Sequence, residues 1–467
     1  MHLPAALGRI VFSRPRKKRR ADHGGAVVEA SAQEGTDLIS RLPDGVLGTI
    51  VGLLGTEEGA RTAILSRRWR FIWRCAPINL DDRFSFLCTI RKRLHVISQI
   101  LAAHRGPARR LALTAPISSS NFSRYDDWFP LPIFDTLQEL VLHFPSNPDH
   151  HEMPATALRF RCLRVLDLDN CTFSASACTP SFPCLTYLSL RHVGITEELL
   201  HAMISNSPGM EHIMLDTNFG HRRLCLSLPR LRCLAVSVKC YNRVAQIELE
   251  DILIEDAPSL ERLLLHEVNY GPSVRITRPT KLKMLGYLGT GFPIIQLGHS
   301  IFKAMVPVNL VDQLSSVTIL ALKMPEPKLK VVIGYLTCFP CLEKLHVKFL
   351  IYSWTSFKCA LRWNPFVPIE CLDRSLKTIV LQLYAGLRTH VEFAKFFIKR
   401  ARVLEVMKFC CIGPYTTRWL QNQHRQLNIN SRVSWHAKFL FVRDCDLPLR
   451  FWMDDCFSRK DPFKETR

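Results

Sequence analysis

The chain has 467 residues, 47% of them hydrophobic and 22% charged, and its formal net charge is +21. This length and apolar content suffice for more than one domain with a sizeable core, and no apolar run of about 18 residues is present to cross a bilayer. The positive charge raises nucleic acid as a partner, but six of the charges lie in one short N-terminal segment and acidic residues are interleaved with the rest.

Residues 1–36 are predicted to be a disordered basic tail with little to bury. One run of cations fits a nuclear import signal, which needs an extended, exposed cluster of positive charge. The run consists of Arg14, Arg16, Lys17, Lys18, Arg19 and Arg20. A solvated tail without that role is the alternative. The segment lacks a secretory pattern, so the 17 scattered cysteines indicate reduced thiols, and we expect the protein in the nucleus, the cytoplasm or both.

Three short helices are predicted in residues 37–83. Pro43 suits the first position of a helix, and apolar residues follow it at helical spacing. Thr56 is expected to cap a second helix and Ser66 a third, which carries Trp69 and Trp73. Such a small unit can hardly stabilise itself, so its surplus apolar side chains are expected to bury against another surface.

A repeat fills residues 84–370. The frame Pro-x-Leu-x-x-Leu-x-Leu returns most clearly from Pro183, Pro258 and Pro340, and its copies, loose ones included, are roughly 21 to 34 residues apart, near the leucine-rich-repeat period. The Leu-x-Leu part of such a repeat is a short strand. Its leucines point into the solenoid core and its x residues face the concave surface, with helices or loops outside.

Three cysteines, Cys162, Cys184 and Cys341, take the same place in this frame, directly before its first leucine. We predict a small, buried side chain there, because a free thiol packs as an apolar group. Packing then explains the single Cys-x-x-Cys, Cys338 to Cys341, and no metal site is expected.

Residues 371–427 are expected to close the solenoid with a strand at 376–381, an amphipathic helix at 391–401 and a strand at 403–409. Such a unit can cover the open edge of a stack of repeats. The last segment, residues 428–467, is rich in aromatic side chains, and the sequence leaves open whether it packs on this end.

Two stretches near the N-terminus, residues 37–44 (DLISRLPD) and 61–70 (RTAILSRRWR), closely resemble the F-box of plant F-box/leucine-rich-repeat proteins. Residues 376–411 resemble the FBD region that often closes those chains, and residues 461–463 resemble their tails. The resemblance covers nearly the whole chain past residue 36. It implies an α/β fold with a three-helix F-box, an irregular leucine-rich-repeat solenoid and an FBD-like end.

The resemblance also implies a non-catalytic substrate-recognition subunit of an SCF-type ubiquitin ligase. In that family the F-box binds a Skp-type adaptor, which links it to cullin and RING subunits, and the repeats hold the protein to be ubiquitinated. Carried over by position, the adaptor-facing residues are Leu42, Pro43, Val46, Leu47, Ile50, Leu54, Leu65, Trp69 and Trp73.

Three glycines depart from a good helix sequence in this F-box. Gly45, Gly48 and Gly52 all fall in the predicted first helix, and each costs up to about 1 kcal/mol of helix propensity relative to alanine. We therefore expect weaker adaptor binding, or a helix that orders only in the complex.

The x positions of the repeat strands are the candidate contacts to the target protein. They mix both charges with histidine, as a protein-binding surface does, whereas a surface that follows phosphates is mostly Lys and Arg. They are Asp167, Asp169, Arg191, His192, Asp216, His266, Glu267, His346 and Lys348.

Other classes of function fit the sequence less well. It contains no phosphate-binding Gly-x-x-x-x-Gly-Lys, no His-Glu-x-x-His and no Gly-x-Ser-x-Gly. Residues 286–291, a faint glycine-rich match, lie within a repeat, where we expect a turn. No catalytic residue and no cofactor is predicted. A scaffold without a ubiquitin role and a basic nucleic-acid-binding repeat protein are the alternatives.

Overall fold

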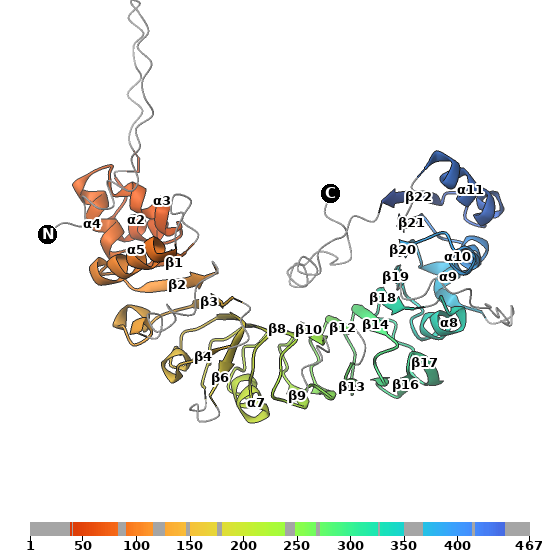
Figure 1. Cartoon of the computed structure of the whole chain (residues 1–467), viewed down its shortest axis with the longest axis horizontal. Coiled ribbons are helices and arrows are strands. Elements are labelled where there is room, and N and C mark those ends of the chain that lie inside the picture. Colours follow the sequence, from red (N-terminus) through yellow and green to blue (C-terminus); the bar gives the residue numbers. More distant parts are fainter. Residues whose placement is uncertain are drawn as a thin grey trace, which may run out of the picture. The chain divides into compact units, whose positions relative to one another are not determined.

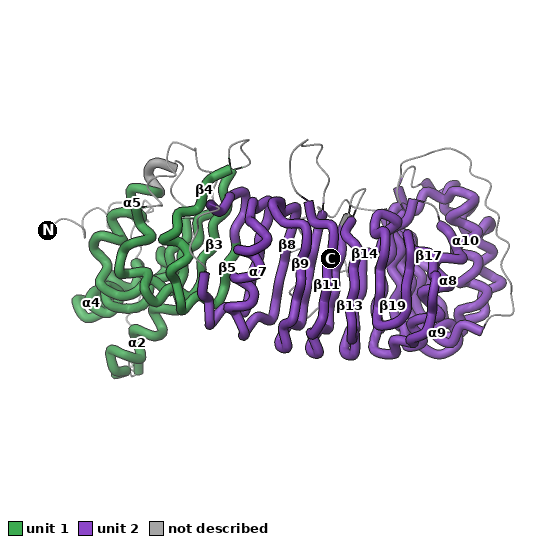
Figure 2. Tube along the Cα trace, turned by 90° about the horizontal axis from the view of Figure 1, so that it is seen from below, with its two compact units in different colours: residues 1–167 green, residues 168–467 purple. Residues whose placement is uncertain are grey.

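The structure is a computed structural model that describes residues 38–39, 41–82, 90–114, 127–145, 150–174, 180–238, 248–267, 271–325, 327–349, 368–412 and 416–443. The chain divides into two compact units, residues 1–167 and 168–467 (Figure 2). The predicted import signal at residues 14–20 and the tail beyond residue 443 lie outside the described residues, so both stay predictions.

Unit 1 begins with the three predicted helices (Figure 1). They are α2 (Asp44–Val51), α3 (Thr56–Thr62) and α4 (Arg67–Cys75). Ser66 caps α4 as predicted, since its hydroxyl oxygen accepts a hydrogen bond from the Trp69 amide at 3.3 Å. The predicted Thr56 cap is wrong. Gly55 holds the N-cap position of α3, and the Thr56 hydroxyl donates to the carbonyl of Asn79 instead.

These helices are tied to the first strands of the repeat. The elements that follow are β1 (Ile78–Asp81), α5 (Ile90–Ala103), β2 (Ala108–Leu113), β3 (Glu139–His143), β4 (His151–Met153) and β5 (Val165–Asp169). The Asn79 side chain donates to the carbonyls of Gly52 and Leu54 at 2.8 and 2.9 Å. The Arg105 amide donates to the carbonyl of Arg74 at 2.9 Å. The helices and these first strands thus belong to one compact unit, and the domain bounds expected from the sequence stay a prediction.

Unit 2 is built on one parallel sheet with one strand per repeat, in the order β7-β8-β10-β12-β14-β18-β19-β20-β21-β22. Leu188 lies opposite Ile213, which lies opposite Leu234, and all three are fully buried. This register confirms the predicted leucine-rich-repeat solenoid. The strands are β7 (Tyr187–Arg191), β8 (His212–Asp216), β10 (Cys233–Val238), β12 (Arg262–Glu267), β14 (Met284–Gly289), β18 (Ile319–Met324), β19 (Lys344–Phe349), β20 (Thr378–Tyr384), β21 (Val406–Cys411) and β22 (Lys438–Arg443).

A second layer covers one side of this sheet, as Figure 1 shows. Its helices are α7 (Glu197–Ser205), α8 (Leu329–Cys338), α9 (Glu370–Arg374), α10 (Arg388–Arg400) and α11 (Thr417–Leu427). Its strands are β6 (Cys171–Phe173), β9 (Arg223–Ser227), β11 (Asp251–Asp256), β13 (Ser273–Ile276), β15 (Ile294–Leu297), β16 (Ser300–Lys303) and β17 (Val306–Asn309). We call the opposite side of the sheet, which bears the x residues, the strand face.

The expectation of only helices or loops in this layer is wrong for the middle repeats. There β9, β11, β13, β15, β16 and β17 form a six-stranded sheet. The cause is visible in β9, where Leu224 and Leu226 are buried and the residues beside them are exposed. An alternation of period two is the pattern of a strand with one buried face.

The predicted strand, helix and strand of the closing segment are present as β20, α10 and β21, within a few residues of the expected bounds. The apolar face of α10 is buried as expected, including Val391, Ala394 and Phe397. The sheet then continues beyond the prediction, because α11 leads into β22, which pairs in parallel with β21.

A histidine is enclosed in this closing segment. The ring of His390, on α10, stacks on Phe349 with 4.2 Å between centroids and lies 5.6 Å from the ring of Tyr384. Its Nδ1 accepts a hydrogen bond from the Ala385 amide at 3.2 Å. Burial lowers the pKa of His390 from 6.5 to about 4, so the ring is neutral at pH 7.

The prediction that Cys162, Cys184 and Cys341 are buried is wrong, since all three are exposed. Each occupies the third position of a tight turn that leads into a strand. In one such turn the amide of Leu185 donates to the carbonyl of Phe182 at 3.0 Å. The two apolar residues at the ends of this turn, Phe182 and Leu185, are buried, and the two residues between them, Pro183 and Cys184, are exposed.

Candidate protein-binding sites

The helices of unit 1 expose an unusual amount of apolar surface. Sixteen large hydrophobic side chains are exposed among the described residues, and half of them belong to the segment from residue 38 to residue 71. They are Leu38, Ile39, Val46, Ile50, Leu53, Ile64, Leu65 and Phe71. We call this set the F-box surface. A concentration of exposed apolar side chains in one small part of a protein marks a candidate protein-interaction site.

The nine predicted adaptor-facing residues divide between this surface and the core beneath it. Pro43, Val46, Ile50 and Leu65 are exposed, and Leu42, Leu54 and Trp69 are partly buried. Leu47 and Trp73 are 0% and 8% exposed and belong to the core of the helices, so their predicted place at the adaptor interface is corrected to packing.

Two stripes on α2 explain this division. Leu47 and Val51, one turn apart, pack toward Ile72 and Trp73 in one core cluster. A second stripe, at positions 46 and 50, faces away and is exposed, and Leu53, just after the helix, is exposed as well. The sequence contains both stripes, but spacing alone does not say which of them is the inner one. The exposed Leu38, Ile39, Leu53, Ile64 and Phe71 were not predicted.

An ion pair fixes the entrance to α2. Arg68 Nε donates to Asp44 Oδ1 at 2.7 Å, and the same guanidinium donates to the carbonyl of Leu42. Asp44 lies in the first turn of α2, where a carboxylate also interacts favourably with the helix dipole. The contact holds residues 42–44 against α4 and thereby positions this part of the F-box surface.

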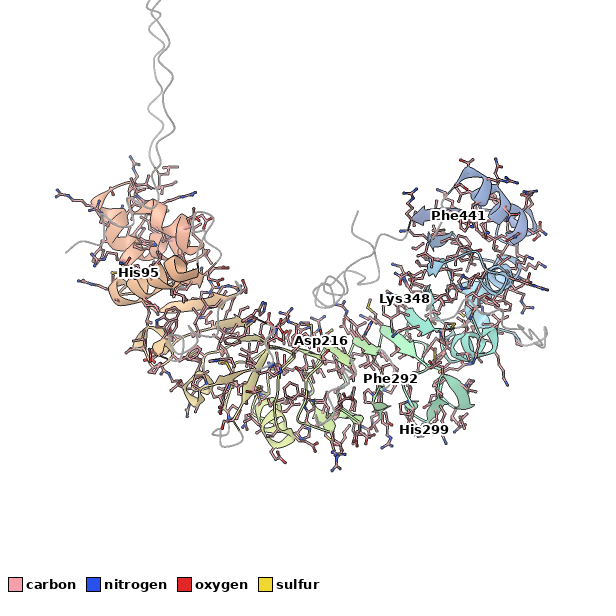
Figure 3. All side chains as sticks on the ribbon, viewed as in Figure 1. His95, Asp216, Phe292, His299, Lys348 and Phe441 are labelled. Carbon is pink, nitrogen blue, oxygen red and sulfur yellow. The ribbon has the colours of Figure 1, made fainter. Side chains whose placement is uncertain are left out.

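The second candidate site is the strand face. Figure 3 shows Asp216 and Lys348 on this side of the sheet, with His299 on the far side. At one end of unit 2 the predicted contact residues mix acidic side chains with histidine and arginine. His192 Nδ1 lies 3.1 Å from Asp169 Oδ1, and the Thr217 hydroxyl donates to Asp216 at 2.8 Å. Arg191 is partly buried beside them. Two of the predicted residues here, His192 and Asp169, thus pair with each other.

Asp167 belongs to unit 1, where its carboxylate lies 3.3 Å from Nε2 of His143.

His192 follows β7 with a φ of 51°, and Asn170 and Thr217 have φ values of 58° and 55° at equivalent places after their strands. Asn and His are among the residues that adopt this left-handed conformation most readily. His192 therefore also has a structural role as the residue that ends a strand.

The middle of the strand face is apolar. Its buried cluster consists of Met214, Cys233, Ala235, Leu264, Met284, Tyr287 and Ala321. The Tyr287 hydroxyl donates to Oε1 of Gln382 at 3.0 Å, which joins β14 to β20 across the face.

His266 and His346 are buried, so the prediction that they are exposed contacts is corrected. The side chain of Glu267 lies outside the described residues.

The expected turn at residues 286–291 is wrong for its first part, which is strand β14. Gly286 is required there because a Cβ at this position would lie 2.5 Å from the Cβ of Ala321 on the neighbouring strand. The glycine therefore serves close packing of two strands, a reason other than phosphate binding.

The far end of the strand face is basic. Five lysines lie on it, of which only Lys348 was predicted, and we call them the lysine surface. The register places them on one face, because residues two apart along a strand share a side. They are Lys323, Lys344, Lys348, Lys408 and Lys438.

Known families match two parts of the chain. The family model described as "FBD-associated F-box protein At5g56370, LRR repeats" matches residues 125–347, and the FBD model matches residues 365–409. The F-box/FBD/LRR-repeat protein At1g13570 of Arabidopsis thaliana is 23% identical over 444 residues, which cover 88% of this chain and 100% of that protein. The F-box/FBD/LRR-repeat protein At5g56420 of the same plant is 24% identical over 418 residues, which cover 84% of this chain and 94% of that protein. The chain belongs to the plant F-box/FBD/LRR-repeat family.

In this F-box/FBD/LRR-repeat protein the FBD match spans α9, β20, α10 and the beginning of β21. The FBD region is therefore the closing part of the solenoid, as predicted, and it contains His390.

Among the described residues, no group of three or more His, Cys, Asp or Glu side chains is placed to hold a metal ion. Within the described residues, no helix is long and apolar enough to span a membrane.

Two glycines in the F-box of this family member offer a test of helix stability. α2 contains Gly45 and Gly48, while Gly52 lies at its C-cap and not inside it as expected. A Cβ added at Gly45 or Gly48 meets no atom within 4 Å. Gly45→Ala and Gly48→Ala are each expected to raise the unfolding free energy of unit 1 by about 0.5–1 kcal/mol, measured by chemical denaturation.

Gly52→Ala is the matched control for these variants. Its added Cβ would lie 3.2 Å from Pro77 and from the carbonyl of Gly48, so no gain in stability is expected. Equal gains at Gly45, Gly48 and Gly52 would contradict the described packing of α2.

Proposed function

We propose that this F-box/FBD/LRR-repeat protein is the substrate-recognition subunit of an SCF-type ubiquitin ligase. The F-box surface binds a Skp-type adaptor, and through it cullin and RING subunits, while the strand face binds the protein to be ubiquitinated. The chain itself supplies no reacting group. Its contribution is proximity, since holding a target beside a charged ubiquitin carrier raises the effective concentration of the two reactants.

The observation on which this proposal rests most is the F-box surface. Eight large apolar side chains are exposed on the three short helices and on the segments that precede and join them, while the same helices bury a small core of their own. Leaving such side chains in water has no benefit for an isolated protein, whereas burying them drives association. The position of this surface in an F-box family member makes a Skp-type adaptor the expected partner.

The test is reconstitution with purified components. The full chain, co-expressed with a plant Skp-type adaptor, is expected to elute with it as one complex in size-exclusion chromatography. After addition of cullin, RING subunit and charged ubiquitin carrier, ubiquitin is expected to be transferred to the chain itself only when the adaptor is present. Absence of an adaptor complex overturns the proposal. Adaptor binding without any ubiquitin transfer indicates a scaffold instead.

A further inference from the structure

Two rows of core side chains end at β22, the last strand of the sheet (Figure 1). One row passes from Leu381 through Phe409 to Phe441, and the next row passes from Met407 to Phe439. The side chains of these rows on β20 and β21 are fully buried, whereas the two phenylalanines on β22 are only partly buried. A further strand beside β22 would remove the rest of both rings from water, which favours its binding.

The backbone of β22 has one side on which such a strand can pair. Among the described residues, β22 pairs with β21 alone. The Lys438 amide donates to the carbonyl of Glu405 at 2.8 Å. In a parallel pair every second residue directs its N–H and its C=O to the same neighbour, so Lys438 and Leu440 face β21 and Phe439 faces the other side. A strand edge of this kind is a template for a further strand.

The residues that follow β22 have the sequence pattern of a strand with one apolar face. From residue 447 to residue 453 every second residue is large and apolar, and Pro448, Arg450 and Trp452 lie between them. An alternation of period two predicts a strand with one buried face. The apolar residues of the alternation are Leu447, Leu449, Phe451 and Met453.

A short hairpin brings this apolar face onto the two core rows. A loop of three residues, here residues 444–446, is a common connection between antiparallel strands. With this loop Leu449 lies opposite Phe441, and Phe451 lies opposite Phe439. Because opposite residues in a sheet share a face, the apolar side chains then extend both core rows by one strand.

The proline in the segment agrees with the same register. Pro448 then lies opposite Val442, which faces β21 like the other residues at even positions of β22, so the position of its missing N–H points to solvent. A loop of two residues would instead place Pro448 opposite Phe441, where a hydrogen bond to β22 needs the N–H. Proline is tolerated on an edge strand only in the first arrangement.

We propose that residues 447–453 dock on the open edge of β22 as an antiparallel strand and close the core of the solenoid at this end. The segment is joined to β22 by a short loop, which gives it an effective concentration on the order of millimolar, and a strand from another protein has to compete with that. A second copy of the chain fits less well, since its β22 paired about Phe441 places Arg443 opposite Phe439, at the end of a core row.

Hydrogen exchange at single residues tests the docking on the full chain and on a chain that ends at Arg443. It is measured by mass spectrometry with electron-transfer fragmentation. The Phe439 amide is expected to exchange at least about tenfold faster in the shorter chain, because the docked strand accepts its hydrogen bond. The Met407 amide, inside the sheet, is the control and should change less than about twofold.

Two point variants of the full chain keep the test decisive if the shorter chain does not fold. Phe451→Asp places a charge on the docked apolar face, so it should speed exchange of the Phe439 amide about tenfold as well. Phe463→Asp makes the same chemical change outside the proposed strand and should leave that exchange rate as in the wild-type chain.

A fluorescein-labelled peptide of residues 444–467, kept under reducing conditions, identifies the occupant directly. Fluorescence anisotropy is expected to show that it binds the chain that ends at Arg443. Its binding to the full chain should be at least about tenfold weaker, because the chain's own segment occupies the edge. The same peptide carrying Phe451→Asp should not bind the shorter chain.

Several results overturn the proposal. These are equal exchange of the Phe439 amide in the full and the shorter chain, equal peptide binding to both, or an effect of Phe463→Asp as large as that of Phe451→Asp. Another is protection of the Phe439 amide that increases with the concentration of the full chain as light scattering reports a dimer, because a second copy is then the occupant. None of these measurements involves the adaptor, so their failure leaves the proposed function unaffected.

Discussion

Leu65→Asp is expected to weaken binding of the Skp-type adaptor at least about 30-fold without unfolding unit 1. The side chain is 68% exposed, between α3 and α4, so aspartate at this position faces water in the free protein. In the complex the same carboxylate would be buried against apolar groups of the adaptor. Losing an anchor residue of an interface typically costs about 2 kcal/mol or more, and burying an unpaired charge adds to that loss. Isothermal titration of the purified chain with the adaptor measures the effect.

Val308→Asp is the matched control for this variant. Val308 is 59% exposed on β17 in unit 2, so the same chemical change is made on another exposed apolar residue. Its adaptor affinity should equal that of the wild-type chain, and both variants should keep the wild-type melting temperature. Phe71→Asp repeats the test within the F-box surface. Unchanged adaptor binding in both Leu65→Asp and Phe71→Asp would show that the adaptor binds elsewhere.

Lowering the pH from about 6.5 to 4 is expected to reduce the unfolding free energy of unit 2 by about 3 kcal/mol through His390 alone. Burial lowers the pKa of this ring from 6.5 to about 4 in the folded chain. Between these values the unfolded chain binds a proton that the folded chain does not. The contribution of His390 is therefore complete above pH 6.5, is lost as the pH falls toward 4, and changes little below that.

His390→Asn isolates this effect, because asparagine does not titrate and can still offer an oxygen to the Ala385 amide. Urea denaturation of wild type and variant across this pH range should give a stability difference that shrinks as the pH falls. Gln421→Asn, a change at an exposed position of α11 that involves no titrating group, is the control and should give a constant difference. A His390→Asn difference that is equally constant would mean that the ring is not enclosed as described.

The parts of the fold that follow local patterns could be predicted from the sequence. The Leu-x-Leu frame determines which side of each strand is buried, so the solenoid and the buried Leu188 were predictable. Ser66 directly precedes a helix and accepts a hydrogen bond from the Trp69 amide, and this cap was also predictable. The outer strands were not predicted, although Leu224 and Leu226 alternate with exposed residues, because an alternation over only five residues fits a short loop as well as a strand.

The sites depended on features that a sequence pattern does not contain. Leu47 and Val46 are adjacent apolar residues on one helix, and only the packing of α4 decides that the first is inside and the second outside. The lysine surface comes from strands far apart in the sequence, and it needs the register of five strands to place Lys323, Lys348 and Lys408 on one side. His346 was expected at the surface but is buried on the strand face.

The hydrogen bonds between the F-box helices and the first strands determine where chimeric proteins can be joined. The carbonyl of Arg74 accepts from the amides of Arg105 and Gly106, and the amide of Ile78 donates to the carbonyl of Pro107. A graft that ends at residue 83 would leave these groups without their partners. An F-box exchanged between two members of the family should therefore be transferred together with α5 and β2, so that the recipient scaffold receives the donor helices with their own supporting strand.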